Sequence, residues 1–156
     1  MRTLAAVILM AVAATDQPGV GQKNHANSIE QLNTLIKTGS ISRVELLRLP
    51  DYIDTRVSVS PKALRAIAYY KVSFNRDIGY TFEPLLSGLS AEPENHTPDL
   101  RWGVLFYDSR NDEVGSIFVD RFGNHGYLNG KTVSFHTGIL NASLAQRLHA
   151  IIRNLP

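Results

Sequence analysis

The dipeptide Asn129–Gly130 constrains the fold of this chain more than any other short segment. Both central residues of a two-residue type I′ turn need a positive φ angle, and Asn followed by Gly is a favoured pair there. The segments on either side alternate apolar and polar side chains, as half-buried strands do. We therefore expect a tight hairpin in which Tyr127 faces Thr132 and His125 faces Ser134.

The same pairing extends to two earlier strands if residues 121–124 and 109–112 form loops. Phe118 then faces Tyr127, and Gly103 faces Phe118. A slip of one residue in the pairing register would move every side chain of a strand to the opposite face. The register is therefore tested by whether all the strands place their apolar side chains on the same face. The strands agree on one set of core residues, which are Trp102, Val104, Phe106, Ile117, Val119, Leu128, Val133 and Phe135.

Helix signals surround this meander. Ser28 and the pair Ser60–Pro61 are typical of helix starts, because a capping hydroxyl precedes the first helical turn. The expected helices are 29–37, one that begins at Pro61, 84–89 and 141–154; the expected strands before the meander are 42–49 and 70–78, with a short extended piece at 55–60 and a polar loop at 90–99. This order predicts an α+β fold with an antiparallel sheet of about four to six strands, a C-terminal β-meander, and helices packed on one face.

The N-terminus has the pattern of a secretory signal. A positive charge at Arg2 precedes an unbroken apolar run that ends at Ala14. The run is shorter than the roughly 20 residues that span a bilayer. We expect residues 1–14 to be a signal peptide cleaved after Ala13 or Ala14, residues 15–27 to be a flexible leader, and residues 28–156 to form one α+β domain. The predicted location is periplasmic or secreted.

The composition narrows the class of partner. Apolar residues make up 44% and charged residues 19% of the chain, as in ordinary globular domains. The net charge is only +2, and the basic residues are scattered, whereas nucleic-acid sites need clustered Lys and Arg. There is no cysteine, so burial alone must hold the domain together. We expect no nucleic-acid partner and no stable membrane anchor once the signal is removed.

The face of the meander opposite the predicted core is not plainly polar. Aromatic residues beside an arginine are typical of protein-binding surfaces. The predicted partner-binding residues are Arg101, Leu105, Tyr107, Phe118 and Tyr127. The alternative is that residues 42–60 or the C-terminal helix cover this face and make it a second core. A third interpretation is that the patch closes a homodimer.

The same register places Asp120, His125 and His136 in a loose row across three strands. Two imidazoles and a carboxylate can hold a divalent metal, although the spacing fits no named metal motif and solvated histidines at strand ends are commoner. No catalytic residues are predicted, because the chain has no cysteine, no Gly-x-Ser-x-Gly elbow and no Ser-x-x-Lys motif. No cofactor is predicted either, since there is no glycine-rich phosphate loop.

These patterns favour an exported, non-enzymatic domain that binds another protein, as an inhibitor, an immunity protein or an envelope accessory protein does. The alternative function is a small metal-assisted hydrolase that uses Asp120, His125 and His136.

Overall fold

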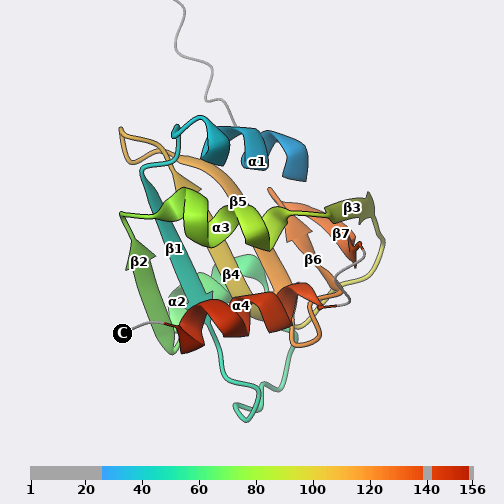
Figure 1. Cartoon of the computed structure of the whole chain (residues 1–156). Helices are drawn as coiled ribbons and strands as arrows, with labels where there is room; N and C mark the ends of the chain where they lie inside the picture. Colours follow the sequence, from blue (N-terminus) through green and yellow to red (C-terminus); the bar gives the residue numbers. More distant parts are fainter. Residues whose placement is uncertain (1–25, 139–141, 155–156) are drawn as a thin grey trace, which may run out of the picture.

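The structure is a computed structural model that describes residues 26–138 and 142–154. The predicted signal peptide with its cleavage residues Ala13 and Ala14, and the leader up to residue 25, lie outside the described residues. The fold is α+β, as predicted (Figure 1). In chain order the elements are α1 (Ile29–Lys37), β1 (Arg43–Arg48), α2 (Pro61–Ile67), β2 (Tyr70–Phe74), α3 (Ile78–Leu86), β3 (Leu89–Pro93), β4 (Leu100–Tyr107), β5 (Glu113–Asp120), β6 (His125–Leu128), β7 (Lys131–Thr137) and α4 (Leu144–Arg153).

The strands form one seven-stranded antiparallel sheet in the order β2-β1-β4-β5-β6-β7-β3. This is one strand more than the upper end of the predicted range. The strands β2 and β3 form the two edges of the sheet, at the left and right of Figure 1. Within the described residues, no helix has the length and apolar character needed to cross a membrane.

Three helices, α1, α3 and α4, lie side by side on one face of the sheet (Figure 1). Side-chain caps begin two of them: Ser28 accepts a hydrogen bond from the Gln31 N–H, and Ser143 and Gln146 form a reciprocal capping box. The helices bury the sheet face that the sequence assigns to the core. All eight predicted core residues of the meander are buried there, and Trp102 and Phe106 are among the largest fully buried side chains.

The fourth helix, α2, packs on the opposite face and builds a second, smaller core (Figure 1). The prediction that the helices pack on one face of the sheet therefore holds for three of the four helices. Leu64 of α2 is fully buried, and Leu49 and Val59 bring the segment between β1 and α2 into the same cluster. This second core lies over β1, β4 and β5, which leaves the β6–β7–β3 half of that face to be considered separately.

The meander has the predicted register. Tyr127 pairs with Thr132, and Phe118 pairs with both Tyr127 and Gly103 across its two neighbouring strands. Asn129 and Gly130 have φ angles of 49° and 83°, as the type I′ turn requires. The Asn129 side chain also accepts a hydrogen bond from the Ser116 N–H at 2.6 Å, which ties the turn to β5.

Three local predictions were wrong. Pro84 does not begin a helix but lies inside α3, which starts six residues earlier, after Asp77 in a left-handed conformation. Residues 89–93 form the edge strand β3 and not a loop, because they pair with β7. Residues 55–60 form no strand; Val59 instead donates its N–H to the Asp99 carboxylate at 2.9 Å.

Candidate functional site

The predicted partner-binding patch is largely covered. Leu105 and Phe118 are each only 2% exposed, because α2 and the segment before it pack over them. Arg65 of α2 adds a lid over the Phe118 ring, with its guanidinium carbon 5.1 Å from the ring centroid. The same guanidinium forms two hydrogen bonds to the Glu113 carboxylate, at 2.8 and 2.9 Å. The expectation that Leu105 and Phe118 face solvent was wrong, and the alternative that residues 42–60 contribute to a second core is confirmed.

Arg101 is also buried, at 2% exposure, so it does not belong to an open surface. Its guanidinium lies 2.6 Å from the Asp99 carboxylate and donates to the Ile53 carbonyl at 3.3 Å. Asp99 in turn accepts the Val59 N–H. Arg101 therefore fastens the segment between β1 and α2 to the sheet. The prediction that Arg101 lies on a partner-binding surface was wrong, because the segment between β1 and α2 folds over this side chain.

Tyr107 and Tyr127, the other two predicted contact residues, are half-buried. The Tyr107 hydroxyl donates to the Glu45 carboxylate at 3.2 Å, and the Arg43 guanidinium carbon lies 3.7 Å from the ring centroid. Burial, followed by the nearby charges of Glu45 and Glu113, raises the pKa of Tyr107. These contacts give Tyr107 a structural role at the end of β4. Tyr127 remains as the one member of the patch in the β6–β7–β3 half of the sheet.

That half of the face is open. None of its outward side chains is buried, although Tyr127, on the strand beside the covered half, packs against the second core. The backbone register places the side chains in rows: Tyr127 beside Thr132, and His125 beside Ser134 and then Glu92. We call this surface the histidine–glutamate face; it consists of Ser90, Glu92, Glu94, His125, Tyr127, Thr132, Ser134 and His136.

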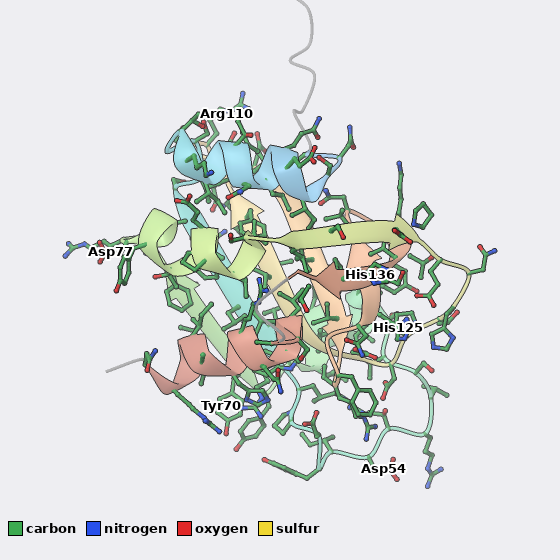
Figure 2. All side chains as sticks on the ribbon, turned by 45° about the vertical axis from the view of Figure 1, so that its right-hand side comes forward. Asp54, Tyr70, Asp77, Arg110, His125 and His136 are labelled. Atoms are coloured by element: carbon green, nitrogen blue, oxygen red, sulfur yellow. The ribbon has the colours of Figure 1, made fainter. Side chains whose placement is uncertain are left out.

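Histidine–carboxylate pairs organise this face. The His125 Nδ1 atom lies 2.8 Å from Glu94 Oε2, and His136 Nε2 lies 3.7 Å from Glu92 Oε2. The ring of His96, which follows β3, stands edge-on to the His125 ring at a centroid separation of 5.5 Å. Figure 2 places His125 and His136 on the same side of the molecule. The His125–Glu94 contact is at hydrogen-bond distance, whereas the His136–Glu92 pair is longer and mostly exposed.

The predicted metal row does not come together as a ligand set. Asp120 is nearly buried, and its Oδ1 atom accepts the backbone N–H groups of Gly123 and Asn124 at 2.7 and 3.1 Å. It therefore closes the loop between β5 and β6. His125 and His136 turn to separate glutamates. Among the described residues, no three His, Asp or Glu side chains have a geometry that fits a metal ion.

The face also lacks the arrangement of a hydrolytic triad. A triad needs the nucleophile on one imidazole nitrogen and the carboxylate on the other. Here the Ser134 hydroxyl, at 3.3 Å, and the Glu92 carboxylate both approach Nε2 of His136.

A cavity of about 350 Å³ lies elsewhere, between α1 and strands β3 and β7, and its apolar lining includes Ile29, Leu89 and Val133.

Sequence reasoning missed the two glutamates because it assigned residues 90–99 to a loop. The alternation of Leu89 and Ala91 with Ser90 and Glu92 is the signal that would have identified a strand. It was obscured by Pro93, which an edge strand tolerates.

Sequence reasoning also missed an aromatic group on the helix side of β1 and β2. The Arg48 guanidinium carbon lies 4.8 Å from the Trp102 ring centroid and 6.0 Å from that of Tyr70. The His149 ring packs edge-on against Trp102, at 4.6 Å between centroids. Burial, then the positive charges of Arg48 and Arg153, lower the pKa of His149, against an opposing effect of Asp51.

Comparison with known proteins adds no assignment: no family model, no curated protein and no solved structure matches the chain significantly.

Proposed function

We propose that this chain is an exported, non-enzymatic domain that binds another protein through the histidine–glutamate face. The observation that carries the proposal is the uneven cover of the sheet. Three helices pack on one face and α2 packs over the β1–β4–β5 part of the other, whereas no outward side chain of the β6–β7–β3 half is buried. A polar surface bordered by a half-buried tyrosine resembles the rim and anchor of many protein interfaces.

The charge of the face supports an inference about the charge of the partner. Its formal charges are those of Glu92, whose side chain is 74% exposed, and Glu94, whose side chain is 25% exposed. A surface of this kind favours a partner that presents Lys or Arg, because complementary charges speed association and exclude wrong partners. Tyr127 lies between the acidic strand β3 and the covered half, where it offers a flat, half-buried ring to the same partner.

Export rests on the N-terminal pattern, which lies outside the described residues. The charged start and the apolar run up to Ala14 are typical of a signal peptide, and we place the mature domain in the periplasm or outside the cell. The absence of cysteine means that this domain would fold there without disulfides.

A charge-reversal experiment tests the binding surface. Glu92→Lys changes an exposed carboxylate on the face, and Asp54→Lys makes the same charge change on an exposed loop that Figure 2 places away from His125 and His136. Tagged wild-type protein and both variants are expressed in the native host, and co-purifying proteins from the extracytoplasmic fraction are compared. We expect one basic protein to be lost with Glu92→Lys and kept with Asp54→Lys. Equal recovery with both variants contradicts the proposal.

A further inference from the structure

The two edges of the sheet differ in how they are protected against another strand. An edge strand leaves a row of backbone N–H and C=O groups without a partner in the sheet, and proteins blunt such edges with Pro and charged residues. β3 carries both devices, in Pro93 and Glu92. β2 has the sequence Tyr-Lys-Val-Ser-Phe, with no proline and with Lys71 as its one charge. Among the described strands, only β1 pairs with it.

The side chains of β2 are held in place on the helix side. Phe74 packs edge-on against Phe82 of α3, at a centroid separation of 5.1 Å, and Tyr70 lies under the Arg48 guanidinium. On the other side, Lys71 donates to the Arg65 carbonyl at 2.8 Å. The side chains of this edge strand are therefore held in place, and both of its aromatic rings remain partly accessible to solvent.

Large apolar side chains are exposed around this edge. Tyr69 is 66% exposed and stacks edge-on against Tyr70, which is itself 44% exposed. Ile67, at the end of α2, and Tyr80, in the first turns of α3, add exposed surface just before and after β2 in the chain. Exposed large apolar side chains such as the Tyr69–Tyr70 pair are typical of a contact site when they gather in one place.

We propose that β2 pairs antiparallel with β2 of a second copy of this chain, around a two-fold axis at Val72, to join two sheets into one. In this register Tyr70 faces the partner's Phe74 twice by symmetry, and Val72 faces the partner's Val72. Aromatic and β-branched pairs across strands are stabilising. Lys71 faces the partner's Ser73, so no like charges meet.

Shifted registers place less favourable side chains opposite each other. This preference for one self-paired register is why we propose a second copy of the chain as the partner of β2. The joined sheets keep their helices on the same side only if the register shifts by an even number of paired positions, because side chains alternate between faces. A shift in one direction places Lys71 opposite the partner's Lys71. A shift in the other direction places Phe74 opposite the partner's Val72 and removes both aromatic pairs. A strand that is complementary to itself in one register favours an isologous dimer.

The interface is small, so the dimer is expected to be weak. Five paired residues and their exposed neighbours bury less than the roughly 1,600 Å² of a standard interface. We expect a dissociation constant of about 10–100 μM. The inference concerns the β2 edge alone and does not depend on the partner proposed for the histidine–glutamate face.

Disulfide trapping tests the geometry directly, because the chain has no cysteine of its own. Opposed residues of antiparallel strands have Cα atoms about 4.5–5.5 Å apart, within the range that a disulfide bridges. We expect mild oxidation of the Val72→Cys variant to give a covalent dimer at least about tenfold faster than oxidation of Ser90→Cys, the matched control on the β3 edge. Equal rates overturn the proposal.

Charge variants at an exposed position test the register without disturbing the fold. Ser73→Lys places a lysine opposite the partner's Lys71 twice, while Glu45 lies beside it within the same chain. Sedimentation equilibrium should show dimerisation weakened about tenfold. Ser73→Thr should leave dimerisation unchanged, and Lys71→Glu with Ser73→Lys should restore it. A wild-type monomer at about 1 mM, or a dimer insensitive to Ser73→Lys, overturns the proposal.

Discussion

The aromatic ring of Phe118 lies directly over Gly103, its cross-strand neighbour in β4. A Cβ atom added at Gly103 would come within 2.9 Å of the Phe118 ring and 3.3 Å of the Leu47 side chain. The glycine therefore provides the space that the Phe118 ring occupies beneath α2. This contact lies within the second core, which α2 and the segment before it close.

Gly103→Ala should destabilise the fold, because the Phe118 ring is buried and packed by Arg65 from above. We expect a loss of about 1–3 kcal/mol in the free energy of unfolding, measured by urea denaturation. Combining Gly103→Ala with Phe118→Leu should cost less than the sum of the single changes, because the smaller side chain makes room. Strict additivity would contradict the proposed steric contact.

Arg101→Met should destabilise the fold by about 3 kcal/mol, because it leaves the Asp99 carboxylate without its closest cationic partner. The segment between β1 and α2 should also become sensitive to trypsin at Arg56, since the guanidinium no longer holds the Ile53 carbonyl. Arg110→Met, at a side chain that is 70% exposed, is the control and should change stability by less than about 1 kcal/mol. A stable, trypsin-resistant Arg101→Met variant would show that this anchor is dispensable.

Asp120→Ala should cost about 1–2 kcal/mol, because the Asn124 N–H loses its side-chain acceptor and the Gly123 N–H keeps only the longer bond to the Asp120 carbonyl. Asp120→Asn keeps one acceptor oxygen and should cost less. Elemental analysis of the purified protein separates this role from a metal site. A stoichiometric divalent metal that disappears in Asp120→Asn or His125→Ala would favour the hydrolase alternative.

His149 should make stability depend on pH. Its pKa is lowered in the folded state, chiefly by burial, so the folded protein takes up the proton less readily than the unfolded chain. The stabilising contribution is therefore complete above the unfolded pKa of about 6.5 and is lost as the pH falls below it. His149→Gln should show a smaller loss of melting temperature between pH 7.5 and pH 5 than the wild-type protein. An identical loss in both would exclude His149 as the cause.

The meander could be predicted because its information is local. Asn129–Gly130 sets one pairing register, and the alternation of side chains then assigns every neighbouring strand to a face. This is why the sequence alone assigns Trp102 and Val133 correctly to the core. The burial of side chains on the second face depends on contacts between segments that are distant in the sequence. Phe118 and Tyr127 occupy the same face, and only the path of α2 decides that one is buried and the other half-open.

The sequence misplaces α3 and hides β3 because each contains a proline. Tertiary contacts that the sequence does not display accommodate both prolines. Pro84 is accommodated near the end of α3, where neighbouring Phe82 and Leu85 are buried in the main core. Pro93 ends β3 at the free edge of the sheet, where its missing N–H costs no ladder bond to a further strand. Because the predicted sheet did not include β3, the pairing of Glu94 with His125 and of Glu92 with His136 was not predicted.

The most direct test of the histidine–glutamate face is site-specific photo-crosslinking in the native host. A photoreactive phenylalanine analogue is placed at Thr132, in the middle of the face, and at Asp54 as a control on the exposed loop. Irradiation should attach one basic extracytoplasmic protein at position 132 and none at position 54, and the Glu92→Lys change should abolish the product. No crosslink at position 132, or the same product at both positions, would contradict the account.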